Sequence, residues 1–139
     1  MIVSVGVAAV VWRDARFLLI RRGKEPNRGL WAFPGGSVRF REPLITAAVR
    51  ELSEETGVRG DHPRLLTPVE IISPPEFQGQ AYHFVLVPVL FHWQSGEGAA
   101  SDDAEAVRWC DPAEMQALAV VPTLWPVLEE ALALLGSAK

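Results

Sequence analysis

The sequence contains a single cysteine, Cys110, so no disulfide can form within the chain. No other Cys or His stands near it at metal-ligand spacing, and we interpret it as a buried structural thiol. Long apolar runs are also missing, because the longest, Ile2–Trp12 and Tyr82–Trp93, are too short to cross a bilayer as helices. The chain starts without the basic region and cleavage pattern of a signal peptide. These absences predict a soluble, cytoplasmic protein with no membrane partner.

Basic residues do not dominate the composition, and the net charge is −4. This argues against a protein that binds nucleic-acid polymers, because such proteins usually need a broad basic face. The charges are unevenly distributed, since residues 1–50 hold nine of the 13 Lys and Arg but only three of the 17 Asp and Glu. Small polyanions could bind where the basic and acidic parts meet. The alternative is that the charges only solvate separate faces, and charge distribution alone favours that alternative.

Alternating strand and helix patterns predict an α/β fold within one domain that spans residues 1–139. No repeat, low-complexity tract or linker divides the chain, and 49% of its residues are hydrophobic. Proline and glycine make Trp31–Val38 a turn between short extended pieces. The β-branched and apolar segments expected as strands are Ile2–Trp12, Phe17–Arg22, Val69–Ile72, Tyr82–Trp93 and Ala106–Trp109, the first two as a hairpin. The expected helices are Pro43–Thr56 and about Thr123–Leu135, which together give an α/β sandwich with a mixed sheet.

Three glutamates recur on one face of the first expected helix. Glu51, Glu54 and Glu55 project within an arc of roughly 100° at helical spacing. Carboxylates this close repel one another unless a hard divalent cation binds them, and Mg²⁺ is the expected ion, with Mn²⁺ as a plausible substitute. Arg50 could orient one of them through a charge-assisted hydrogen bond. The alternative is an ordinary solvated helix face, which these residues alone would favour.

The segments that flank this helix favour a cation site over a solvated helix face. A Gly-Gly turn lies upstream, an acidic residue precedes the helix, and a glycine that can take the left-handed capping position follows it. The whole segment resembles the Nudix box, which specifies a glycine, a glutamate and the Arg-Glu-U-x-Glu-Glu-x-Gly-U run at fixed spacing, with U a bulky aliphatic residue. Every specified position is matched, by Gly36, Glu42, Arg50, Glu51, Leu52, Glu54, Glu55, Gly57 and Val58.

The resemblance implies the Nudix α/β/α sandwich with a mixed β-sheet over nearly the whole chain. It also implies metal-dependent hydrolysis of the pyrophosphate bond in a small nucleotide. Glu51, Glu54 and Glu55 would contribute metal ligands, directly or through water, with help from the carbonyl of Gly35. Arg50 would act beside these catalytic glutamates.

Supporting and substrate-binding roles also follow from the resemblance. Glu42 and Gly57 would fix the geometry of loop and helix, and Arg41 occupies a free position where many relatives carry glycine. The residues expected to bind substrate are Arg22 and Arg21 on its phosphates, Gly36, and Trp31 by stacking on a base, although aromatic residues in such segments more often belong to the core.

The general base is expected outside the box or from a box glutamate. Relatives often take it from a loop, and here an acidic loop precedes the short strand Ala106–Trp109. We predict Asp103 by its distance from that strand, with Asp102 and Glu105 as close rivals. Composition alone would make this segment a solvated loop.

Three functions remain open from the sequence. Hydrolysis of ADP-ribose or a nucleotide sugar is favoured, because Pro74-Pro75 lie near the spacing at which ADP-ribose pyrophosphatases place a proline. Hydrolysis of nucleoside triphosphates is the second, and Thr123 and its neighbours lack the asparagine that mutator-type enzymes place before the last helix. A non-catalytic Nudix-fold regulator is the third, but this chain keeps all the box acids. The sequence leaves open whether the chain forms a homodimer.

Overall fold

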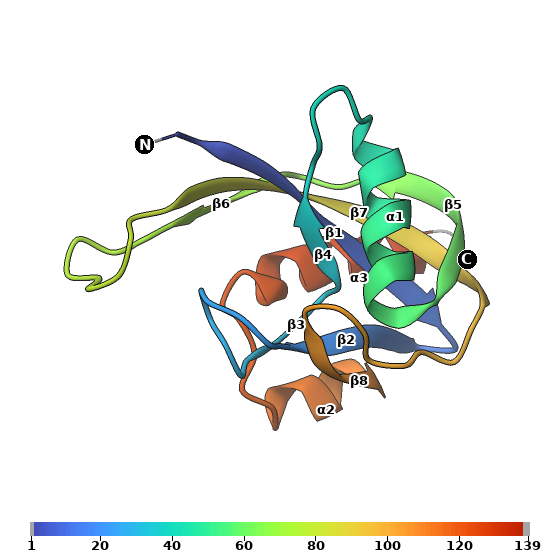
Figure 1. The fold of residues 1–139 in the computed structure, drawn as a ribbon. Coiled ribbons are helices and arrows are strands. Elements are labelled where there is room, and N and C mark those ends of the chain that lie inside the picture. Colours follow the sequence, from blue (N-terminus) through green and yellow to red (C-terminus); the bar gives the residue numbers. More distant parts are fainter. Residues whose placement is uncertain (1, 138–139) are drawn as a thin grey trace.

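The computed structural model describes residues 2–137 and arranges them as a mixed β-sheet between helices (Figure 1). The expected hairpin is confirmed, and its two-residue turn contains Asp14 and Ala15 with φ of 47° and 65°, which suits the twist of the strands. The elements run in the order β1 (Ser4–Arg13), β2 (Arg16–Arg22), β3 (Trp31–Ala32), β4 (Gly35–Ser37), α1 (Leu44–Thr56), β5 (Arg59–Leu65), β6 (Val69–Ile72), β7 (His83–Ser95), β8 (Ala104–Cys110), α2 (Pro112–Gln116) and α3 (Leu124–Ser137).

Strand β1 is the centre of the sheet. It pairs in parallel with β7 from Ser4 to Trp12, and antiparallel with β4 and β2 at the two ends of its other side. Strand β2 continues the sheet to β3 and β8, while β7 carries β5 and β6 on its outer side. The parallel β1–β7 pair joins segments that are distant in sequence, and it makes the sheet mixed as predicted.

Side chains of β1 alternate between two hydrophobic cores, because successive residues of a strand point to opposite faces. Val7, Ala9 and Val11 pack on the face covered by α1, whose buried residues include Ala48 and Leu52. Ala8 and Val10 pack on the opposite face, which α3 covers with Leu124, Val127, Leu128 and Ala131. This confirms the α/β/α sandwich, and it explains why β1 reads as a continuous apolar run.

Helix α1 lies where the sequence predicts it. Pro43 is its N-cap with extended backbone angles, and Gly57 ends it at φ 74° with its N–H donating to the Ser53 carbonyl at 2.9 Å. Cys110 is fully buried in the α3 core, as expected of a structural thiol. None of the helices in residues 2–137 is long and apolar enough to cross a membrane.

Two elements were not predicted. Strand β5 has the polar sequence RGDHPRL, and its residues lie mostly at the surface, so it shows no apolar alternation. Backbone pairing with β7 forms this strand, with register shifts at Gly60 and beyond Asp61. Helix α2 has only five residues, and its hydrophobic content is one buried side chain, Met115. A capping box between Asp111 and Glu114 starts it.

Candidate active site

A cavity of about 460 Å³ opens between the sheet, α1, α3 and the loops that follow β2 and precede β8. One part of its wall is charged and contains Arg22, Lys24, Glu51, Glu55 and Asp103. Another part is apolar and is formed by β6, β7 and α3, through Ile71, Phe84, Leu86, Leu124 and Val127. A ligand with a polyanionic end and a flat, weakly polar end would match both parts.

The Gly35-Gly36 segment lies against the cavity because it has no side chains. A Cβ on Gly35 would collide with the Val7 carbonyl oxygen of the neighbouring strand. A Cβ on Gly36 would overlap the carboxylate of Glu51. Strand β4 can therefore pair with β1 only with glycine at position 35, whereas a side chain at position 36 would displace the Glu51 carboxylate.

Glu55 is the buried acid of the site, with 4% of its surface exposed. Its Oε1 accepts a hydrogen bond from the Gly35 N–H at 2.9 Å. Burial raises the pKa of Glu55 to about 7 against the effect of that hydrogen bond, and the nearby charges of Glu51 and Asp103 raise it further. The cost of burying its charge is thus the main reason that Glu55 binds a proton more readily than an ordinary carboxyl group.

Arg50 connects the box residues into one network. Its guanidinium donates to Glu42 at 2.8 and 2.9 Å, to Glu51 at 2.6 Å, to Glu54 at 2.8 Å and to the Ser37 carbonyl at 3.0 Å. These carboxylates raise the pKa of Arg50 far above its usual range, so it stays charged. The supporting role expected of Glu42 therefore has a physical basis, because Glu42 fixes the residue that touches two of the three glutamates.

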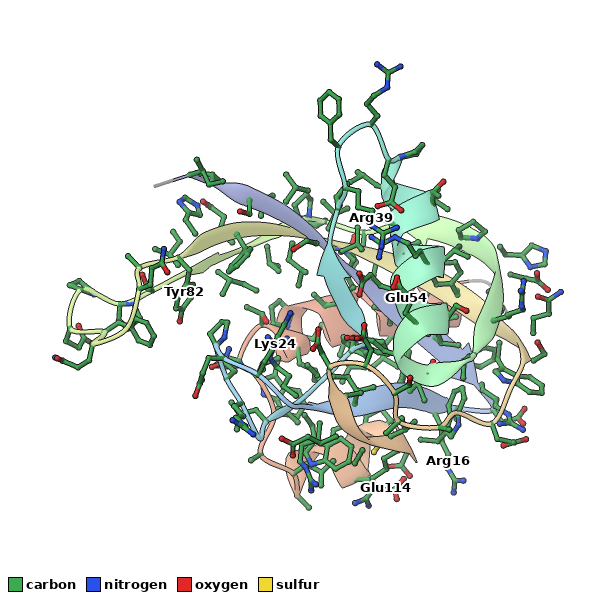
Figure 2. The ribbon with its side chains drawn as sticks, viewed as in Figure 1. Arg16, Lys24, Arg39, Glu54, Tyr82 and Glu114 are labelled. Atoms are coloured by element: carbon green, nitrogen blue, oxygen red, sulfur yellow. The ribbon has the colours of Figure 1, made fainter. Side chains whose placement is uncertain are left out.

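The three glutamates do not converge on one point. Glu51 and Glu55 lie against Gly36 and Gly35, whereas Glu54 lies outside the cavity wall. Glu54 pairs with Arg50 and with Arg39, and Figure 2 labels Glu54 and Arg39. Across residues 2–137, no three His, Cys, Asp or Glu side chains are close enough together to hold a metal ion. Arg50 contacts one oxygen of each of the two acids other than Glu55, Glu51 Oε1 and Glu54 Oε1, through the same nitrogen.

Asp103 lies in the cavity wall, as a candidate base must. Its carboxylate pairs with Lys24 at 3.0 Å, and its carbonyl accepts from the Gly23 N–H at 2.9 Å. Asp102 also lines the cavity, with φ of 56°. Glu105 does not line it, because its carboxylate pairs with Arg21 and Arg28. Of the three candidate bases, Asp103 and Asp102 therefore line the cavity and Glu105 does not.

The four residues expected to bind substrate divide into two groups. Arg22 and Gly36 line the cavity, and the Nε of Arg22 donates to the Pro26 carbonyl at 2.8 Å. Arg21 and Trp31 do not line it, since they pair with each other on β2 and β3, with the guanidinium 5.8 Å from the ring centroid. Successive residues of β2 face opposite ways, so Arg21 and Arg22 cannot both point into the cavity.

The apolar part of the cavity wall was not predicted from the sequence. Phe84, Leu86, Leu124 and Val127 have the spacing of ordinary core residues, and apart from Phe84 they do belong to, or pack against, the α3 core. Only their position at the edge of that core exposes part of each side chain to the cavity. No local pattern distinguishes such residues from fully enclosed ones.

Comparison with known proteins agrees with the box and the fold. A family model described as the NUDIX domain matches residues 3–131. The ADP-ribose pyrophosphatase of Methanocaldococcus jannaschii is 32% identical over 108 residues, which cover 78% of this chain but only 62% of that protein. The CTP pyrophosphohydrolase of Escherichia coli is 32% identical over 132 residues, which cover 92% of this chain and 90% of that protein.

A solved structure shows the same similarity in three dimensions. The MutT Nudix hydrolase of Burkholderia pseudomallei superposes with a TM-score of 0.76 at 30% identity, and the match covers 93% of this chain and 98% of that one. Enzymes of this family generally use a divalent metal and act on small nucleotides. With a complete box that contributes Gly36, Glu51 and Glu55 to the cavity wall, and a family match over almost its full length, this chain belongs to the NUDIX domain family and is a Nudix pyrophosphohydrolase.

Proposed function

We propose that this enzyme hydrolyses the pyrophosphate bond of a nucleoside diphosphate derivative of the ADP-ribose or nucleotide-sugar type. The division of the cavity into a charged and an apolar part carries the proposal. The apolar part suits the flat face of a base, and the charged part offers Arg22 and Lys24 to phosphate oxygens beside the acidic residues. The two parts are contiguous, so one ligand can contact both.

Mg²⁺ is the cofactor that fits the donor set best, with Mn²⁺ as the alternative. Carboxylate and carbonyl oxygens are hard ligands, and Glu51, Glu54 and Glu55 with the Gly35 carbonyl would supply them. Burial raises the pKa of Glu55, and a bound cation would favour its charged form. When bound, a divalent ion neutralises phosphate oxygens and makes a coordinated water more acidic.

The protein's own residues have separate tasks in this proposal. Arg22 binds a phosphate of the substrate, and the bare backbone of Gly36 lets the diphosphate approach α1 closely. Asp103 accepts the proton of the attacking water, while Lys24 orients its carboxylate through the 3.0 Å ion pair. Arg50 holds the carboxylates of Glu51 and Glu54 near each other, because its Nη1 donates to both.

Hydrolysis of a nucleoside triphosphate to monophosphate and pyrophosphate is the second candidate. The relative named CTP pyrophosphohydrolase aligns over 90% of its own length, whereas the ADP-ribose pyrophosphatase aligns over 62%. The Pro74-Pro75 pair, which favours ADP-ribose by its spacing, lies in the β6–β7 loop and does not line the cavity. Both observations favour a test of the two substrate classes side by side.

The test is product analysis by mass spectrometry with ADP-ribose, a nucleotide sugar and CTP, each with Mg²⁺. The proposal expects AMP with ribose 5-phosphate from ADP-ribose, and a matched pair of products from the sugar nucleotide. Release of CMP with pyrophosphate from CTP, without turnover of the other two, would replace the first candidate by the second. Absence of turnover with all three compounds would overturn both.

A further inference from the structure

The pairing of β8 with β2 is irregular at Glu105, next to the cavity (Figure 1). The two strands keep one register up to the pair of Arg21 with Ala106. The next pair joins Arg22 to Ala104, so Glu105 is the extra residue of a β-bulge. Bulges are common beside active sites, where they redirect a side chain.

The bulge decides which of two adjacent arginines meets this acid. In a regular antiparallel ladder Arg22 would pair with Glu105, and the two side chains would lie on the same face. In the structure, Glu105 Oε2 instead accepts from Arg21 Nε at 3.3 Å, outside the cavity wall. Arg22 lies in that wall, and its Nε donates to the Pro26 carbonyl at 2.8 Å. The charge of Arg22 is therefore left for a ligand, while Glu105 neutralises its neighbour.

Glu105 also contacts the loop between β2 and β3. Residues 23–27 of this loop form part of the cavity wall, and Arg28 follows them directly. The Oε1 of Glu105 lies 3.7 Å from Arg28 Nε. One carboxylate thus links Arg21, just before the loop, with Arg28 near its far end.

Two further contacts join the start of the same loop to the segment before β8. The Gly23 N–H donates to the Asp103 carbonyl at 2.9 Å, and Lys24 Nζ lies 3.0 Å from Asp103 Oδ2. A Cβ on Gly23 would lie 2.8 Å from the Asp103 carbonyl oxygen and 3.1 Å from Glu105 Cγ, so a side chain there would force the segments apart. The loop is therefore held against the segment of the candidate base at both of its ends.

We propose that Glu105 is a positioning residue for the hydrolysis. Its ion pairs with Arg21 and Arg28 hold the β2–β3 loop against the segment that carries Asp103, and they leave Arg22 free to bind a substrate phosphate. This role rests on the proposed function, in which Arg22 binds phosphate. Glu105 acts on the substrate only through the loop, because its own side chain lies outside the cavity wall.

The kinetic test compares Glu105→Gln with the wild type on whichever nucleotide the enzyme hydrolyses. We expect KM to rise roughly threefold or more with a smaller change in kcat, because the wall that binds phosphate loses its support and the reacting groups stay in place. The melting temperature should change little, since exposed ion pairs contribute little to the stability of a fold.

Three results would overturn the inference. A fall in kcat of roughly 10²-fold at constant KM would make Glu105 a catalytic group. Unchanged KM and kcat would remove it from the site. A large fall in melting temperature, with KM and kcat changed alike, would assign it to the stability of the fold.

A second variant shows whether Glu105 acts through its arginine partners. Arg28→Gln should also raise KM, and the double variant Glu105→Gln/Arg28→Gln should not exceed Glu105→Gln alone, because the shared ion pair is already lost. Effects that multiply would contradict this. Glu130→Gln is the matched control, since Glu130 is an exposed glutamate of α3 that contacts a distant loop through Thr67. It should leave KM unchanged.

Amide hydrogen exchange separates this inference from the proposed function, because it needs no substrate. Peptides that cover residues 23–30 should exchange faster in Glu105→Gln than in the wild type, and peptides from α1 should exchange equally in both. Equal exchange in the loop would overturn the inference even for an active enzyme. A wild type without any hydrolase activity would contradict only the proposed function.

Discussion

The guanidinium of Arg50 meets the carboxylate of Glu42 as a two-pronged pair, with Nε to Oε2 at 2.8 Å and Nη2 to Oε1 at 2.9 Å. The remaining nitrogen, Nη1, donates to Glu51 and Glu54. One side chain therefore connects the turn before α1 with two acids of the site. Such forked contacts specify orientation as well as charge, and lysine cannot reproduce them.

Glu42 should stabilise the protein in a pH-dependent way. Hydrogen bonds from the Arg50 side chain and the Arg39 N–H lower the pKa of Glu42 to about 2 in the folded protein. Because the folded pKa lies below the unfolded one, the stabilisation is complete above the unfolded value and is lost as pH falls toward 2. Thermal unfolding of Glu42→Gln and wild type between pH 3 and pH 7 should show a melting-temperature difference that narrows at acid pH. A constant or widening difference would contradict this.

Glu54→Gln and Glu55→Gln should each lower turnover by roughly 10²-fold or more while leaving the fold intact. In Glu55→Gln the amide oxygen can still accept from the Gly35 N–H, and a neutral group replaces a buried acid, so the melting temperature should not fall. Turnover at saturating Mg²⁺ and thermal unfolding measure the two effects. Glu129→Gln, on the exposed side of α3, is the matched control. Near-wild-type turnover in both site variants would remove these residues from the mechanism.

Gly35→Ala should destabilise the protein by roughly 1–3 kcal/mol, because the new methyl group collides with the Val7 backbone and must push β4 away from β1. Gly136→Ala is the control, since a Cβ there meets no atom within 4 Å and alanine suits a helix better than glycine. Urea unfolding of both variants checks the contrast. Equal unfolding free energies would show that the two strands can separate at little cost.

Arg13→Ala should loosen the loop that carries Asp103. The Arg13 guanidinium stacks 3.9 Å from the Trp93 ring centroid and pairs with both oxygens of Glu97 at 2.8 and 3.0 Å. Between Glu97 and Asp103 in the same loop, the Ser101 N–H donates to the Glu55 carbonyl at 3.1 Å. We expect a lower free energy of unfolding, together with a fall in kcat that exceeds any change in KM.

Two further variants serve as comparisons for Arg13→Ala. Arg13→Lys keeps the charge but cannot form the forked pair with Glu97, so its kcat should lie between those of Arg13→Ala and the wild type. Arg64→Ala removes an exposed arginine from β5 and should change neither quantity. If kcat in Arg13→Ala equals that of the wild type, the position of this loop does not limit catalysis.

Features that depend on neighbouring residues were predictable from the sequence. The β1–β2 hairpin, the limits of α1 and the cap at Gly57 follow from local turn chemistry and helical spacing, and the structure confirms all of them. The spacing of Glu51, Glu54 and Glu55 likewise places them on one helix. It cannot decide where their carboxylates point, since Arg50 attracts two of them and Gly35 the third.

Contacts between distant segments were decided only by the tertiary structure. The polar strand β5 exists because β7 provides a backbone edge for it, and the parallel β1–β7 pair aligns segments about 80 residues apart in the sequence. The same pairing directs Arg22 into the cavity and Arg21 toward Trp31, although the two arginines are adjacent in sequence. A linear sequence determines which chemical groups are present and how local turns and helices form. Which groups share a cavity depends on backbone pairing across the sheet. That pairing is stabilised by strands that are distant in sequence, and the local sequence does not identify them.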